Sequence, residues 1–286
     1  MPSAMRLPYP LPMTFALASI HIYPLKSGAP LALKSSAVET RGLARDRRWM
    51  AVDADGKFLT GREHARLTLI RALPNADGSL HLDAPATSGI RVAVPDTHGR
   101  RIATAVWDNP VAPLLADETT NAWLSKFLGK PARLVYMDAE CVRAVDVKYA
   151  RTGDEVSFAD GFPLLLISQA ALDLLNSKLA VPVTMLRFRP NLVVAGSEPH
   201  AEDGWKRIRV GEVEFDVVKP CVRCVFTTVD FERGKRDPSG EPLRTLIGYR
   251  RGEKGVTFGQ NLIPRKLGMV RVGDAVEVLL DESRSR

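Results

Sequence analysis

Short strand-like runs follow one another closely in the first half of the chain, and this spacing constrains the fold more than any other feature. Two of the turns between them are Asp55-Gly56 and Asp77-Gly78, dipeptides that accept the positive φ angles of tight hairpins. Further strand-like runs occupy residues 90–94 and 102–107. Closely spaced strands with such turns are typical of a small barrel or sandwich, so we predict a mainly β first half.

Helical patterns are few. One covers Thr119–Leu128 and stops at Gly129, a second follows a Ser168 cap and carries Leu172, Leu175 and Leu179, and a third covers Pro242–Tyr249. Strand-like runs fill most of the remaining second half, at residues 162–167, 191–194, 208–210, 213–217, 225–229 and 275–279. Strands and helices do not alternate, so the predicted fold class is mainly β with a few helices (α+β). A polar, uneven stretch from Cys141 to Ser157 suggests a boundary between residues 1–136 and 137–286.

The 286 residues carry a net charge of +7 and only three cysteines. A chain of this length buries a core without disulfides, so we expect a reducing compartment, and we predict the cytoplasm. The longest apolar candidate near the start, Leu11 to Ile22, contains Thr14, Ser19 and His21. It is shorter than the ~20 residues of a membrane span. We therefore predict no membrane span and interpret this stretch as a flexible start followed by the first strand.

Cys221 and Cys224 form the outstanding local motif, Cys-x-x-Cys. A structural zinc site needs two further ligands, and beyond Cys141 His200 is the only other Cys or His. A redox dithiol normally begins a helix, whereas β-branched residues follow Cys224. Two interpretations remain open from spacing alone: a thiolate that binds a soft metal centre bringing most of its own ligands, or two buried cysteines that only pack.

Several basic residues lie at the edges of apolar or strand-like stretches, namely Lys26, Arg47, Arg189 and Arg223. Each is explained simply by a charged head that reaches solvent from an apolar stem. The alternative is that they share one phosphate-bearing ligand, because guanidinium forks match phosphate oxygens. Glycine-rich dinucleotide and P-loop motifs, His-Glu-x-x-His and Gly-x-Ser-x-Gly do not occur.

Longer segments, in order, resemble one known family: residues 22–27, 41–49, 188–194, 202–205, 221–230 and 258–261. The resemblance is to MOSC proteins (molybdenum cofactor sulfurase C-terminal domain) that carry an N-terminal β-barrel, and covers nearly the whole chain from about residue 15. Within the family, the chain is most similar to the amidoxime-reducing members and their bacterial relatives.

This resemblance implies a molybdenum-molybdopterin cofactor with one protein thiolate, which by its place in the motif is Cys224, both metal ligand and catalytic residue. The residues that match the family's cofactor-binding positions are Lys26, Ser27, Arg47, Arg189, Asn191 and Arg223, with backbone contacts near Val222. Where the family has a threonine-serine pair after an aspartate, this chain has Gly161-Phe162 after Asp160. Main-chain N–H groups are the contacts expected there.

The resemblance also implies two β-barrel-like units, of which the MOSC barrel carries the cofactor and is joined by the first strands, at about residues 15–47. The activity it implies is reduction of N-hydroxylated compounds such as amidoximes and hydroxylamines by oxygen transfer to molybdenum. Electrons are expected from a separate ferredoxin, flavoprotein or cytochrome, because no four-cysteine ferredoxin domain follows. The alternative is a cofactor carrier or sulfur-handling protein without turnover. Nucleic-acid binding, suggested by the charge, lacks a groove-reading helix, so we predict none.

Overall fold

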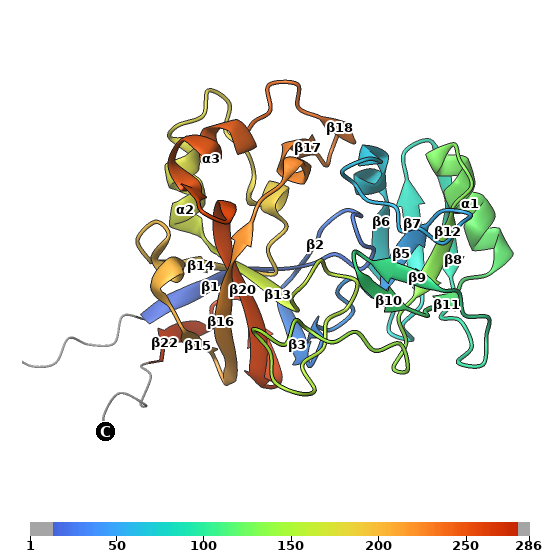
Figure 1. Ribbon diagram of the computed structural model, residues 1–286, viewed down its shortest axis with the longest axis horizontal. Coiled ribbons are helices and arrows are strands. Elements are labelled where there is room, and N and C mark those ends of the chain that lie inside the picture. Colours follow the sequence, from blue (N-terminus) through green and yellow to red (C-terminus); the bar gives the residue numbers. More distant parts are fainter. Residues whose placement is uncertain (1–13, 280–286) are drawn as a thin grey trace, which may run out of the picture.

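A closed barrel of seven strands forms one half of the molecule (Figure 1). The computed structural model describes residues 14–279, so the start of the predicted Leu11–Ile22 segment lies outside the described residues. In spatial order, the barrel strands are β13 (Leu164–Ser168), β14 (Leu192–Ala195), β1 (Thr14–Ile22), β22 (Ala275–Val278), β15 (Arg207–Val210), β16 (Val213–Val222) and β20 (Gly255–Lys266). Pairing of β20 with β13 closes the barrel, which leaves these seven strands no free edge within it.

The first strands of the chain pair with strands from its far end. β1 lies antiparallel between β14 and β22 and also pairs with β2 (Leu31–Leu33). β3 (Ser35–Glu39) pairs with β21 (Gly268–Arg271) and with β4 (Gly42–Leu43). Strands β1 to β4 therefore lie on the barrel half of the molecule. The division of the chain at residue 136 stays a prediction.

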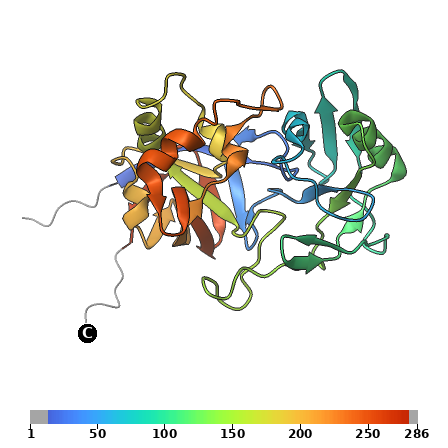
Figure 2. The same cartoon turned by 45° about the horizontal axis from the view of Figure 1, so that its top comes forward.

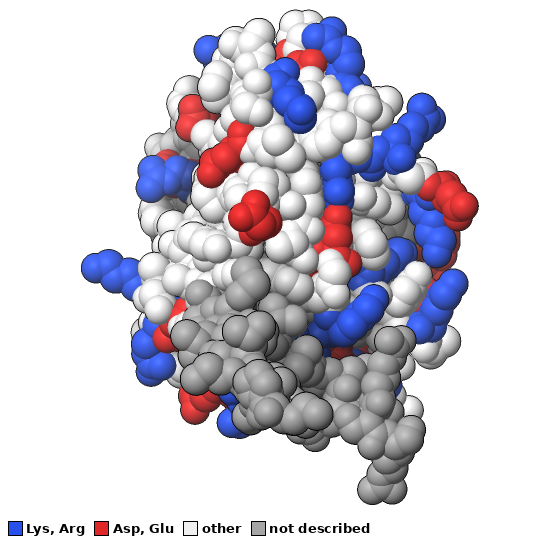
Figure 3. Space-filling model, turned by 90° about the vertical axis from the view of Figure 1, so that its left-hand side faces the viewer, with Lys and Arg blue, Asp and Glu red and all other residues white. Residues whose placement is uncertain are grey.

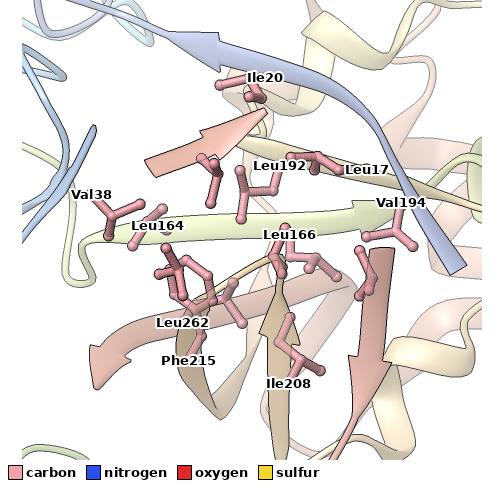
Figure 4. Packing of buried hydrophobic residues seen from close by; sticks show 14 of the residues in the cluster. Leu17, Ile20, Val38, Leu164, Leu166, Leu192, Val194, Ile208, Phe215 and Leu262 are labelled. Atoms are coloured by element: carbon pink, nitrogen blue, oxygen red, sulfur yellow. The ribbon is translucent and has the colours of Figure 1, made fainter. Parts of the chain in front are cut away.

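The barrel interior is apolar. Figure 4 shows Leu166, Leu192, Phe215 and Leu262 pointing toward one another from four strands. All four are fully buried, and burial of each such side chain contributes roughly 1.5–3 kcal/mol. The alternation along β16, in which Val213, Phe215 and Val217 point inward, is the period-two pattern that the sequence shows.

The other half of the molecule consists of short sheets (Figures 1 and 2). Its strands are β5 (Trp49–Val52), β6 (Arg71–Pro74), β7 (Leu80–Ala84), β8 (Thr87–Val92), β9 (Thr104–Val106), β10 (Asn109–Val111), β11 (Leu114–Leu115) and β12 (Arg133–Tyr136). They pair as β11-β12-β5, β6-β7-β8 and β9-β10. The first two sheets surround a second core, and β9 and β10 contribute Val106 and Val111 to a smaller one. The mainly β fold class is confirmed, and we call this half, residues 44–136, the N-terminal unit.

Three α-helices occur in the described residues: α1 (Glu118–Leu128), α2 (Gln169–Asn176) and α3 (Leu243–Arg250). The predicted caps are present, because the Ser168 side chain accepts a hydrogen bond from the Ala171 amide and Gly129 has a φ of 71°. Leu179, predicted on the face of α2, lies beyond its end and packs against the same apolar cluster.

The strand predicted at residues 225–229 is wrong over most of its length. Residues Val225–Thr228 form a 3-10 helix, η4, and only β17 (Val229–Asp230) is extended, paired with β18 (Lys235–Arg236). The hydroxyl groups of Thr227 and Thr228 donate to the carbonyl oxygens three residues earlier. These local hydrogen bonds stabilise a turn and outweigh the β preference of the residue types.

The strand predicted after Asp55-Gly56, at residues 57–60, is wrong, because these residues make only a bridge between Val52 and Phe58. Residues Ala65–Leu69 form the 3-10 helix η1. The remaining short elements are η2 (Met185–Phe188), η3 (Ala201–Gly204) and β19 (Arg251–Gly252).

One side of the molecule carries both charge signs interspersed (Figure 3), so the net charge of +7 is not gathered on that face. The prediction that the chain binds no nucleic acid stays a prediction.

Candidate active site

A cavity of about 370 Å³ is lined by residues from both halves of the molecule. It lies where β16 ends and where β13 and β14 begin. Every residue predicted for the site lines it: Lys26, Ser27, Arg47, Gly161, Phe162, Arg189, Asn191, Val222, Arg223 and Cys224. Proximity is what the structure establishes, and the role of each residue stays a prediction.

These residues fall into two groups by the backbone that carries them. Arg189, Asn191, Val222, Arg223 and Cys224, which we call the barrel group, lie at or next to the ends of β14 and β16. Lys26, Ser27, Arg47, Arg62, Asp160, Gly161 and Phe162, the loop group, lie on irregular segments. Sequence reasoning found all of these except Arg62, and it considered Asp160 only as the residue before Gly161-Phe162.

Cys224 follows β16 and precedes η4, so its backbone leaves the barrel at the cavity. Its half-buried Sγ accepts a hydrogen bond from Nε of Arg62 at 3.1 Å. Cys221, three residues earlier, packs against the apolar cluster that contains Leu165, Phe188 and Phe258. Burial raises the pKa of the Cys221 thiol, which therefore stays protonated at neutral pH. The two cysteines thus differ: one sulfur meets a guanidinium group, the other a largely apolar surface.

Arg189 and Arg223 each keep one buried nitrogen without a hydrogen-bond partner among the described residues. Arg189 donates through Nη1 to the Gly28 carbonyl at 2.8 Å, and Arg223 donates to the carbonyls of Phe258 (2.9 Å) and Phe188 (3.1 Å). Their Nη2 atoms are buried and unpartnered. Burial lowers the pKa of Arg189 to about 10, so the group is charged at neutral pH. Unpaired buried donors of this kind are costly unless an acceptor binds there.

Two side chains fix the loops around these arginines. Asn191 is buried, donates to the His21 carbonyl and accepts from the Leu165 amide, which joins β13, β14 and β1. Arg47 donates to Oδ1 of Asn191 at 3.0 Å and to the Arg189 carbonyl at 3.2 Å. It therefore supports the barrel group from the loop side.

Lys26 and Arg62 share one carboxylate. Nζ of Lys26 lies 2.6 Å from Oδ1 of Asp160, and Nη2 of Arg62 lies 2.9 Å from Oδ2. Burial lowers the pKa of Lys26 to about 8, although the carboxylate opposes the shift. Although desolvation favours its neutral form, the two cations hold the pKa of Asp160 well below its usual range. Asp160 is therefore ionised at neutral pH and holds no proton for a substrate.

The remaining predicted residues have specific local geometry. Ser27 has a φ of 65° and its Oγ accepts from the Gly61 amide at 3.0 Å. At Gly161 the position of an added Cβ has no atom within 4 Å, so the backbone there is uncovered. The Phe162 ring lies edge-on to Tyr149, with ring centroids 5.6 Å apart. These positions leave main-chain N–H contacts as the feasible interaction at Gly161.

Arg62 carried a detectable signal in the sequence. It follows the apolar pair Phe58-Leu59, so it meets the same edge criterion as Lys26. Asp230, the last residue of β17, accepts hydrogen bonds from the amides of Glu232 and Arg233 and so caps the turn that follows. It is not among the residues that line the cavity.

The donor set fits the group that the family resemblance implies. Two unpartnered guanidinium nitrogens match phosphate oxygens, and a thiol sulfur is a ligand that soft metal centres accept. A cysteine next to the end of a barrel strand, beside buried cations, is a donor set that suits an anionic, metal-bearing ligand.

Comparison with known proteins gives the family. The MOSC domain matches residues 153–277, and the MOSC N-terminal beta barrel domain matches residues 14–131. The chain belongs to the MOSC proteins that carry this N-terminal domain, and the resemblance seen in its motifs is confirmed.

Individual relatives are similar over most of the chain. Mitochondrial amidoxime-reducing component 1 is 34% identical in Mus musculus and 33% in Homo sapiens, and each alignment covers 92% of this chain and 82% of that protein. Molybdenum cofactor sulfurase of Oryza sativa subsp. japonica is 32% identical over 85% of this chain, but over only 32% of that protein.

Among the described residues, no helix combines the length and apolar character that crossing a membrane requires. The amidoxime-reducing relatives are named as mitochondrial. The cytoplasmic location predicted from cysteine content therefore stays a prediction.

Proposed function

We propose that this chain is a molybdenum-cofactor reductase of N-hydroxylated compounds such as amidoximes and hydroxylamines. The observation that carries the proposal is the cavity in which Cys224 lies with two arginines that each keep an unpartnered Nη2. The names of the most similar relatives point to the same reaction.

Cys224 is the proposed metal ligand. When bound, the molybdenum cofactor supplies the two-electron chemistry that accepts oxygen from the N–O group of the substrate. The chain's own contribution is to bind, to orient and to shield. Cys224 suits the ligand role because its sulfur meets the Arg62 guanidinium group at the cavity, whereas Cys221 packs against an apolar cluster.

Arg189 and Arg223 are the proposed phosphate-binding pair. Each is fixed by hydrogen bonds to backbone carbonyls, so its free nitrogen is already oriented before a ligand arrives. Pre-orientation reduces the entropy lost on binding. Arg47 and Asn191 position these groups, and Lys26 supplies a further cation at the cavity. Ser27 contributes through its hydroxyl hydrogen, and Gly161, Phe162 and Val222 contribute backbone surface.

Reduction of an N–OH group to N–H with release of water consumes two electrons and two protons. We propose that the electrons come from a separate protein of the ferredoxin, flavoprotein or cytochrome type. Nζ of Lys26, whose pKa lies at about 8, can release a proton near neutral pH, whereas Asp160 is ionised and cannot.

The decisive experiment uses protein prepared in cells that make the cofactor. Molybdenum and pterin are measured first, and reduction of benzamidoxime by an artificial electron donor is measured next. Bound cofactor with turnover supports the proposal, and a preparation without molybdenum or pterin contradicts it.

A carrier or sulfur-handling protein is the second candidate, because the cofactor sulfurase from rice is also a relative. It shares the binding residues, so only turnover separates the two. Bound cofactor without reduction of any N-hydroxylated compound favours the carrier.

A further inference from the structure

Arg62 reaches from the N-terminal unit to the sulfur of Cys224 in the barrel half. Its Nε donates to Sγ at 3.1 Å while Nη2 binds Asp160 at 2.9 Å. The centre of the guanidinium group lies 4.4 Å from the ring centroid of Trp107. Arg62 therefore has three separate contacts that fix one orientation of its side chain.

The backbone of this segment is fixed as well. The Arg62 amide donates to Oγ1 of Thr60, and the Arg62 carbonyl accepts from Nη2 of Arg236 at 2.6 Å. At Gly61 an added Cβ would lie 2.4 Å from the ring of Phe226, in the turn that follows Cys224. A larger residue at this position would displace the Phe226 ring, so the segment is packed directly against the cysteine turn.

Trp107 supports the arrangement from the other side. It is 44% exposed and has a φ of 55°, an unfavourable position for a large apolar residue. Its ring meets Phe58 edge-on, with centroids 5.0 Å apart, and its face is covered by the Arg62 guanidinium. The contact with Arg62 gives this strained, exposed tryptophan a structural role.

We propose that Arg62 is a positioning residue that holds the Cys224 thiolate and raises the reduction potential of the metal bound by that sulfur. This inference rests on the proposed function, because it requires Cys224 to be a metal ligand. A charged hydrogen-bond donor draws electron density from a thiolate, which then donates less to the metal and favours its reduced state. The reach of Arg62 also makes the ligand geometry depend on contact between the two halves of the molecule.

The test compares Arg62→Ala and Arg62→Lys with the parent protein and with Arg66→Ala. Arg66 is a matched control, because its guanidinium also lies over an aromatic ring of the N-terminal unit, 4.8 Å from the Phe127 centroid, but it does not line the cavity. Two quantities are measured on the purified, cofactor-loaded proteins: molybdenum per chain, and the midpoint potential from a redox titration followed by electron paramagnetic resonance.

We expect a midpoint potential below the parent's in Arg62→Ala, a smaller decrease in Arg62→Lys, which keeps the charge, and no change in Arg66→Ala. Full molybdenum content in Arg62→Ala together with the parent's potential would overturn the inference. If the alanine variant holds no metal, the lysine variant decides: a potential below the parent's supports the inference, and an equal potential overturns it.

Failure of the proposed function gives a different result. A parent protein without molybdenum defeats the proposed function, and this inference with it. A parent that holds molybdenum but reduces no N-hydroxylated compound defeats only the reductase, because the potential can still be measured in every variant.

Discussion

The barrel group and the loop group line the same cavity but differ in how their positive charges are compensated. In the barrel group, Arg189 and Arg223 bind only neutral carbonyl oxygens and each keeps a free nitrogen. In the loop group, Lys26 and Arg62 are both bound to the carboxylate of Asp160. The barrel group therefore offers uncompensated charge to a ligand, whereas the charge of the loop group is partly neutralised within the protein.

This difference assigns separate tasks to the two groups. Fixed cations with free donors are suited to bind an anion, since little further ordering is needed. A carboxylate bound by two cations links the chain segments that carry these groups, here the segments around residues 26, 62 and 160. We therefore expect changes in the barrel group to act on ligand binding, and changes in the loop group to act first on geometry.

The largest effect is expected from Cys224→Ser, compared with Cys221→Ser. Loss of the proposed ligand sulfur lowers molybdenum content and N-reduction by at least about 100-fold. Substitutions of residues that only hydrogen-bond to a metal ligand reach losses of about 100-fold, and loss of the ligand itself should cost at least as much. Cys221→Ser retains most activity, because that thiol packs against apolar side chains. Metal analysis and turnover of both variants measure the contrast, and equal losses would contradict the assignment of the two sulfurs.

The second prediction concerns Arg189→Gln, which removes a charge from the barrel group. One charge-assisted hydrogen bond contributes about 1.5–3 kcal/mol, so we expect pterin affinity to fall by about tenfold or more. Arg265→Gln is the control, because the largely buried side chain of this arginine is bound to Asp154 and Asp216 and does not line the cavity. The control should lower the melting temperature without a matching loss of pterin per folded chain.

The sequence predicts the barrel group of the site better than it predicts the contacts of the loop group. β13 and β14 are continuous apolar runs and β15 and β16 alternate, so these four strands were predictable, and the barrel group lies at or next to the ends of β14 and β16. The pairing of Lys26 and Arg62 on Asp160 joins positions 134 and 98 residues apart. Nothing local encodes a contact of that range between irregular loops.

The turn after Cys224 shows a second limit. Val225, Thr227 and Thr228 are residue types that favour strands, yet they form η4 because two threonine hydroxyls bond to the backbone and Phe226 packs against Gly61. Tertiary contact overrides an intrinsic β preference there. The sequence signal of Arg62 does not reveal its partner, because Cys224 lies 162 residues further along the chain, in the other half of the molecule.

The third prediction is an increase in anion affinity, whereas the first two are losses of binding. At a pH well below 8, where Lys26 stays protonated, Asp160→Asn removes the carboxylate that compensates Lys26 and Arg62. The affinity of cofactor-free protein for sulfate should then rise about threefold, as expected for a partly exposed ion pair. Arg189→Gln lowers sulfate affinity in the same assay. Sulfate dissociation constants come from its stabilisation of the protein against thermal unfolding. A decrease in Asp160→Asn would show that the loop group does not hold compensated charge.

The smallest effect is a pH dependence that distinguishes Lys26 from the arginines. Because the folded-state pKa of Lys26 is about 8 and its ordinary value is 10.5, the folded protein binds fewer protons than the unfolded chain between these values. The free energy of unfolding therefore gains a contribution that rises with pH across that window.

Over pH 7 to 9, the same titration removes a positive charge from the cavity. Sulfate keeps its charge over this range, so its affinity for the cofactor-free protein should fall as pH rises, by about threefold at most because Asp160 already compensates Lys26. Lys26→Met should abolish this step, whereas Arg189→Gln should keep it with weaker binding throughout. A step of equal size in Lys26→Met would assign the titration to another group and remove Lys26 from the set of cations that a ligand meets.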